Sequence, residues 1–112
     1  MKLITAVIRP SRVDDVKDAL KAAGVLGMTV TEVQGFGRQL GHTEIYRGAE
    51  YKVDLIPKVK VEVLTDEESA TRIADAIAAA ARTDNVGDGK IWMTEIAGVM
   101  RIRTSERDND AI

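Results

Sequence analysis

The sequence is poor in the residues that build covalent and metal sites, since its 112 residues include no cysteine and a single histidine, His42. The lack of cysteine excludes disulfides and thiolate metal sites and is in keeping with a reducing, cytoplasmic environment. One histidine cannot form a histidine metal cluster. The sequence also lacks an apolar run of 18 residues, which excludes a membrane-spanning helix, and its first five residues show no secretory cleavage site.

Aromatic residues are scarce and positive charge is in no excess. There are one tryptophan, two tyrosines and one phenylalanine, and 16 basic residues face 18 acidic ones. Nucleic-acid-binding domains need a basic surface and stacking aromatics, so this composition disfavours DNA and RNA as partners. The length fits a single domain over residues 1–112 and is short for an enzyme that must enclose its own active site. The sequence offers no Cys–His or Ser–His–Asp set, which argues against an enzyme.

The apolar periodicity predicts alternating strands and helices. The first strand is ended by Pro10, and its helix is expected to be capped by Ser11 and ended by Gly24. Asp66 is expected to cap the second helix. The predicted strands cover residues 2–9, 28–36, 58–65, 91–95 and 99–103. This order predicts an α+β fold of the ferredoxin-like, split βαβ type, with two helices on one face of an antiparallel sheet.

The first strand is apolar on both of its faces. Ile4, Ala6 and Ile8 alternate with Leu3 and Val7, so the sheet face without helices should also carry apolar side chains. Because monomers rarely expose such a face, we expect it to be buried against other subunits.

A long segment, residues 37–56, separates the second and third predicted strands and shows little periodicity. It contains both tyrosines, Tyr46 and Tyr51, together with His42, which we interpret as a solvated residue rather than a base. Long loops in compact domains are usually functional or disordered, so this segment is predicted to be a presented surface.

Three groups of residues suit a polyphosphate. The glycines of Gly35-Phe36-Gly37-Arg38 could bring backbone N–H groups to an anion, or form a hinge to the long segment. The run Gly87-Asp88-Gly89-Lys90 reads as a tight turn or as a second phosphate cradle. Arg101 and Arg103 alternate on the last predicted strand, where they could bind an anion or pair with acidic neighbours. Trp92 is interpreted as packing, and the charges Glu67, Glu68, Arg72 and Asp75 as a solvated helix face.

The sequence resembles the PII nitrogen-regulatory signal proteins over essentially its whole length. The residues that carry the resemblance are Gly27 to Val33, Gly35 to Gln39, Gly41 to Glu44, Tyr46 to Tyr51, Pro57 to Lys60, Gly87 to Trp92 and Arg101 to Thr104. The start of the chain and the run Lys90-Ile91-Trp92 look closest to actinobacterial members.

The resemblance implies a homotrimer of ferredoxin-like subunits that binds ATP or ADP in the clefts between them. It places Thr29, Glu62 and Leu64 around the adenine. It places the phosphates against Gly35, Gly37, Arg38, the loop 82–90 with Gly87, Asp88, Gly89 and Lys90, and Arg101 and Arg103. It implies that Gln39 helps to hold Mg²⁺ with ATP, and that 2-oxoglutarate binds at Gln39, Gly87 and Lys58, whose amine pairs with the distal carboxylate.

The resemblance also implies that residues 37–56 are an effector loop. Tyr51 is the nucleotidylation position in many members, and Arg47 contacts ammonium transporters. The implied partners are an ammonium transporter, a nucleotidyltransferase and other nitrogen-metabolism proteins. The chain is expected to associate with a membrane only by binding the transporter. The implied function is regulatory; the alternative is a small nucleotide-hydrolysing enzyme that uses the same phosphate site.

Several residues depart from the family pattern. Leu40 stands where a basic residue is common, and Arg9 replaces the usual lysine. Leu64 replaces a frequent valine and should still pack on a base. Asp84-Asn85-Val86 stands where Gly-Lys-Ile is frequent, and Ser105, in the tail 104–112, replaces the usual glycine. The lost positive charges predict weaker nucleotide or effector binding than in Leu40→Lys and Asn85→Lys variants.

Overall fold

A computed structural model describes residues 1–37, 42–46, 49–53 and 55–112; within 42–46 and 49–53 only the backbone is described. The strands are β1 (Lys2–Ile8), β2 (Thr29–Gly35), β3 (His42–Tyr46), β4 (Ala49–Val53), β5 (Ile56–Thr65) and β6 (Lys90–Glu95). The helices are α1 (Val13–Ala22) and α2 (Ala70–Ala81), with 3₁₀ turns η1 (Pro10–Arg12) and η2 (Asp108–Ala111).

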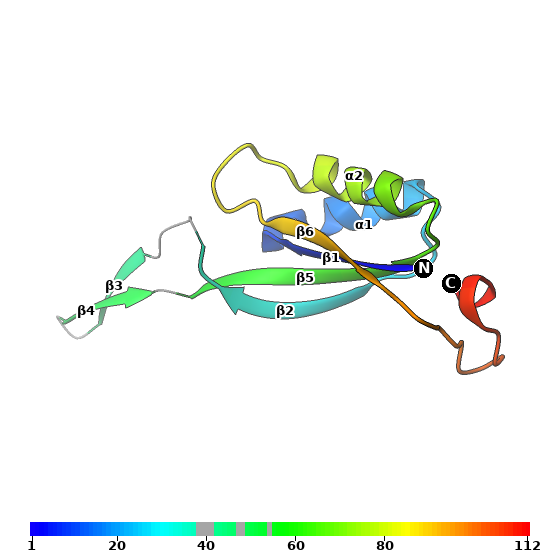
Figure 1. The fold of residues 1–112 in the computed structure, drawn as a ribbon. Coiled ribbons are helices and arrows are strands. Elements are labelled where there is room, and N and C mark those ends of the chain that lie inside the picture. Colours follow the sequence, from blue (N-terminus) through cyan, green and yellow to red (C-terminus); the bar gives the residue numbers. More distant parts are fainter. Residues whose placement is uncertain (38–41, 47–48, 54) are drawn as a thin grey trace.

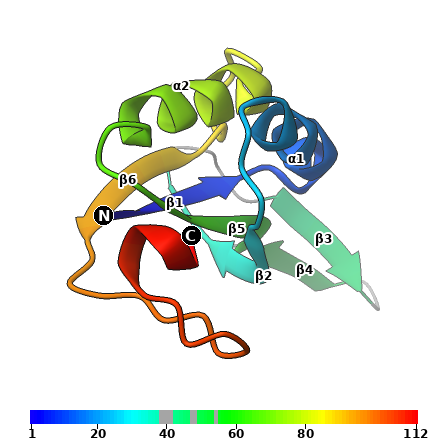
Figure 2. The same ribbon diagram turned by 90° about the vertical axis from the view of Figure 1, so that its right-hand side faces the viewer.

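Four strands form one antiparallel sheet in the order β2-β5-β1-β6. Both α-helices lie on the same face of this sheet, and no α-helix of the described residues covers the opposite face (Figure 1; Figure 2). This arrangement confirms the predicted α+β, ferredoxin-like fold. No helix in the described part of the chain is long and apolar enough to cross a membrane.

The core lies between the sheet and the two helices. Alternate residues of β1 and β5 face the helices and are almost completely buried, as the strand period of two requires. The strand residues of the core are Ile4, Ala6, Ile8, Val59, Val61 and Val63, and the largest helix residues are Val16, Leu20, Ile73 and Ile77. These are the apolar faces that the sequence predicts.

The helix-free face of the sheet is mixed in character. Leu3 and Val7 are half-buried on β1, as predicted, and Leu64 and Trp92 are 38% and 48% exposed on the flanking strands. The intervening positions of β5, such as Lys60, are charged. Burial of this face against other subunits stays a prediction.

The helix ends agree only partly with the predicted caps. Ser11 does not cap α1, because Pro10 opens a 3₁₀ turn in which the Arg12 N–H donates to the Arg9 carbonyl at 3.0 Å. At the other end Gly24, with φ +88°, confirms the predicted stop. The Val25 and Gly24 N–H groups donate to the carbonyls of residues 20 and 21, which is a Schellman motif.

Asp66 precedes α2 and binds its first turn. Its carboxylate accepts bonds from the Ser69 N–H at 2.7 Å and from the Ser69 hydroxyl at 3.2 Å. The helix begins at Ala70, so Asp66 caps the turn that precedes α2 and not the helix itself.

The long segment 37–56 contains β3 and β4, which pair with each other as a hairpin; its role as a presented surface stays a prediction. One predicted strand was wrong. The predicted strand 99–103 is absent: the chain there makes a single bridge between Met100 and Arg107 and a turn between them. The Ser105 N–H closes this turn on the Arg101 carbonyl at 2.8 Å.

Candidate functional site

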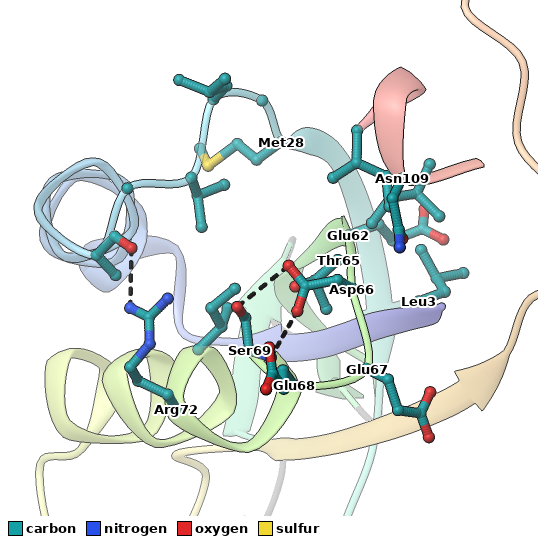
Figure 3. A pocket seen from close by; sticks show the side chains of 18 of the residues that line it. Leu3, Met28, Glu62, Thr65, Asp66, Glu67, Glu68, Ser69, Arg72 and Asn109 are labelled. Atoms are coloured by element: carbon teal, nitrogen blue, oxygen red, sulfur yellow. Dashed lines mark hydrogen bonds between the residues drawn. The ribbon is translucent and has the colours of Figure 1, made fainter. Parts of the chain in front are cut away.

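An open groove of about 1100 Å³ lies where β2 begins and β5 ends (Figure 3). Its walls come from the α1–β2 connection, the first turn of α2 and the C-terminal turn η2. The three residues that the resemblance assigns to adenine, Thr29, Glu62 and Leu64, all line this groove. Thr29 and Glu62 are direct partners across the β2–β5 pair.

The groove combines apolar and polar surfaces as a nucleobase requires. Leu3, Leu64 and Met28 supply apolar surface, and the Glu62 carboxylate supplies an acceptor beside them. Small-molecule sites are typically concave and largely apolar, with a few polar groups that fix orientation. The residues present therefore fit a base.

Sequence reasoning missed parts of this groove. Arg72, interpreted as part of a solvated helix face, donates to the Ala23 carbonyl at 2.9 Å and so ties α2 to the end of α1 across one side of the groove. Glu67, placed on the same solvated face, pairs with Lys2 at 3.5 Å. Asn109 lines the groove from the far end of the chain. No local pattern signals these contacts, because each joins residues far apart in sequence.

A loop of unusual backbone conformation follows α2. Asp84, Gly87 and Gly89 have φ angles of +68°, +104° and +102°. A Cβ atom on Gly89 would lie 1.7 Å from the Val7 carbonyl oxygen, so only glycine fits where the loop returns to the sheet. The run Gly87-Asp88-Gly89-Lys90, predicted either as a turn or as a phosphate cradle, is thus a loop whose backbone geometry depends on glycine.

Asp88 organises this loop from inside. One carboxylate oxygen accepts the Thr83 N–H at 2.7 Å and the Asp84 N–H at 2.9 Å. The other accepts the Thr83 hydroxyl and the Arg9 Nε, the latter at 3.0 Å. The hydrogen bonds from Thr83 are the largest cause that lowers the pKa of Asp88 well below its usual range, and Arg9 adds to them. Asp88 is therefore held as a carboxylate.

Two basic residues connect the loop to the sheet. Arg9 also donates from Nη2 to the Val86 carbonyl at 2.7 Å, and Lys58 Nζ donates to the Gly87 carbonyl at 2.5 Å. Partial burial lowers the pKa of Lys58, and the positive charge of Arg9 lowers it further. The Asp88 carboxylate acts in the opposite direction, so Lys58 lies near both a second cation and an anion at the base of the loop.

Strand β5 links the groove to the loop. Lys58, Lys60, Glu62 and Leu64 alternate with the buried valines and share the helix-free side of the sheet. The distance along the strand from Lys58 to Leu64 is about 20 Å. One row of side chains therefore leads from the predicted base site to the predicted phosphate loop.

The chain matches a known family throughout. The family described as Nitrogen regulatory protein P-II matches residues 1–106. This chain belongs to the PII family. It is 54% identical, over the full length of both chains, to Nitrogen regulatory protein P-II 1 of Escherichia coli K12 and to Nitrogen regulatory protein P-II of Klebsiella oxytoca and of Cereibacter sphaeroides.

Two residues of this PII protein that the resemblance leads us to expect as glycine occur at left-handed backbone positions. Asp84 has φ +68° and Ser105 has φ +60°. A non-glycine residue costs about 1–2 kcal/mol in this conformation, less for aspartate, whose short side chain bonds locally. The bond from the Asp84 N–H to Asp88 helps to offset that cost.

The PII chain does not bring every predicted site residue together. Arg101 and Arg103 do not alternate on a strand; they lie in the turn that follows β6. The glycine loop joins the other end of β6, at Lys90. Arg101 pairs with Glu106 at 2.9 Å, which bears out the alternative of an acidic neighbour. Gly35 ends β2, opposite Ile56, and Gly37 follows it.

Three predicted residues of this PII protein lie outside the described part of the chain: Arg38, Arg47 and the predicted magnesium ligand Gln39. Tyr51 lies in β4, and its side chain is outside the described part. Among the residues that are described, no three carboxylate or imidazole side chains gather as a metal site.

Proposed function

We propose that this chain senses the energy and carbon–nitrogen state by binding ATP or ADP and, with Mg·ATP, 2-oxoglutarate. Its family membership gives it a role in nitrogen regulation, and its relatives are named as regulatory proteins. The proposal extends this role to specific ligands and to specific residues. In this proposal the chain acts through the effector segment 37–56, which regulates an ammonium transporter and other nitrogen-metabolism proteins in the cytoplasm.

One observation carries the proposal. Thr29, Glu62 and Leu64 line a single groove, and the same side of β5 continues to Lys58, whose amine reaches the Gly87 carbonyl in the glycine loop. A nucleotide needs this sequence of surfaces: an apolar site for the base, then glycine backbone N–H groups and positive charge for the phosphates.

The position of the arginines supports a shared site. Arg101 and Arg103 lie beyond β6, away from the loop that begins after α2 in the same chain. The arginines that contact the phosphates at one subunit's loop would therefore belong to a neighbouring subunit. A homotrimer that buries the helix-free sheet face would supply both the neighbour and the cover for Leu64 and Trp92.

Lys58 is placed to connect ligand state with the effector segment. It lies two residues inside β5, just after the hairpin β3–β4 rejoins the sheet. Mg·ATP supplies a metal to which 2-oxoglutarate can bind, and the Lys58 amine would pair with the distal carboxylate instead of the Gly87 carbonyl. Ligands shift a conformation only by binding its alternatives unequally, and this exchange of partners provides such a difference.

Calorimetry tests the proposal. Titration of 2-oxoglutarate should give binding heat in the presence of Mg·ATP and none in its absence. Equal heat under both conditions would contradict the coupled site. The alternative, a nucleotide hydrolase, predicts phosphate release at a steady rate with many turnovers per subunit, whereas a sensor retains its nucleotide.

A further inference from the structure

The resemblance placed Asp88 among the nucleotide contacts, but both of its carboxylate oxygens are already occupied inside the protein. The donors are the Thr83 N–H, the Thr83 hydroxyl, the Asp84 N–H and the Arg9 Nε. The side chain is only 23% exposed. A carboxylate with four internal donors has little capacity left for a ligand, and its charge would repel a phosphate.

These bonds hold the loop at both of its ends. Thr83 and Asp84 are fixed at the start, and the close approach of Gly89 to Val7 fixes the return to β6. Arg9, which lies directly after β1, binds Asp88 and the Val86 carbonyl at once.

Gly87 lies between the two residues that Arg9 holds. Its left-handed φ of +104° would be easily lost in a free loop, because glycine populates many conformations. With residues 86 and 88 both bound, the Gly87 carbonyl is directed to Lys58.

We propose that Asp88 is a positioning residue, an internal anchor that shapes the loop 83–89 and so sets the Lys58–Gly87 contact, and that its carboxylate does not contact the ligand. The ligand-dependent part of this inference rests on the proposed function; the anchoring itself does not. Thr83 donates two of the bonds to the Asp88 carboxylate, and Arg9 connects this carboxylate to the end of β1.

Amide hydrogen exchange on the ligand-free protein tests the anchor directly. Asp88→Asn removes the charge and replaces one acceptor oxygen by a donor, so exchange of the Thr83 and Asp84 amides should rise at least about tenfold. Thr83→Val should produce a similar rise, whereas Thr83→Ser, which keeps the hydroxyl, should restore slow exchange. Asp75→Asn, at an exposed carboxylate on α2, is the matched control and should change nothing.

Unchanged amide exchange in Asp88→Asn would overturn the proposal. If ATP affinity also fell in that variant, the Asp88 side chain would be assigned to the ligand contacts instead. If the wild-type protein binds no nucleotide, the proposed function fails while the exchange result still decides the anchor. An Asp88→Asn protein that unfolds globally is recognised by fast exchange in α2, and the Thr83→Val and Thr83→Ser pair then decides.

Discussion

The side-chain amine of Lys58 donates to the carbonyl oxygen of Gly87 at 2.5 Å, joining β5 to a loop 29 residues further along the chain. The loop end of this contact is shaped by Asp88 and Arg9, and the strand end lies beside the hairpin β3–β4. The contact therefore joins the loop directly to the end of β5 that lies next to the hairpin.

Removal of the Lys58 amine should separate effector binding from nucleotide binding. In Lys58→Met the cation proposed to pair with the distal carboxylate is lost, so 2-oxoglutarate affinity should fall at least about 100-fold, as for a buried charge-assisted contact. ATP affinity should fall less than 2-oxoglutarate affinity, because the base groove lies at the other end of β5 and the phosphate loop loses only the contact at Gly87. Lys60→Met, on the same side of the same strand, is the control in calorimetry.

Loss of the two arginines of the C-terminal turn should weaken ATP binding without dissociating the subunits. Arg101→Ala with Arg103→Ala removes two cations predicted to reach a neighbour's phosphates, and an affinity loss of about 100-fold is expected. Light scattering should report the same mass as for the wild type. An unchanged affinity would show that these arginines serve only local pairs such as Arg101–Glu106.

A methyl group at Gly89 should strongly destabilise the protein. The new Cβ would meet the Val7 carbonyl oxygen at 1.7 Å, and φ of +102° strains any other residue. Gly89→Ala should lower the free energy of unfolding by about 3 kcal/mol or more in urea denaturation. Gly27→Ala, where the added atom meets nothing within 4 Å, should stay within about 1 kcal/mol of the wild type.

Glycine at position 105 should stabilise the chain. Ser105 adopts φ +60°, and its N–H closes the turn on Arg101. Ser105→Gly relieves the left-handed strain and is expected to raise the free energy of unfolding by about 0.5–1 kcal/mol. Ser69→Gly, at a residue with φ −85° whose hydroxyl bonds to Asp66, should do the opposite in the same thermal melts.

The Asp88 carboxylate should contribute a measurable acid dependence. Its pKa is lowered on folding, so the unfolded chain binds its proton first as the pH falls. The stabilisation is complete above the usual aspartate pKa and declines below it, toward the lower pKa of the folded state. Urea melts from pH 6 to pH 3 should show a steeper loss for the wild type than for Asp88→Asn; parallel curves would contradict the depressed pKa.

The core could be predicted because its signals are local. Val59, Val61 and Val63 alternate with charged residues, and Ile73 and Ile77 share one helix face. The strand predicted over 99–103 failed although its residues alternate in the same way. Alternation shows that a segment can pair with a neighbouring strand, whereas the observed turn and the Met100–Arg107 bridge depend on how the chain continues.

The candidate site was less accessible to sequence reasoning. Glycine at 87 and 89 signalled a turn, but the bond that Asp88 receives from Arg9 joins residues 79 positions apart in the chain. The groove residues Thr29, Glu62 and Leu64 were known only through resemblance, because no spacing links them. Their common position follows from the register of β2 on β5, which sequence patterns do not determine.

The hairpin β3–β4 pairs within itself and belongs to a sheet separate from the four-stranded one. Its sequence is therefore released from the register that constrains β1 and β5. A substitution within the hairpin therefore leaves the pairing of the four-stranded sheet intact, and the hairpin can be altered or exchanged in the laboratory without redesign of the scaffold.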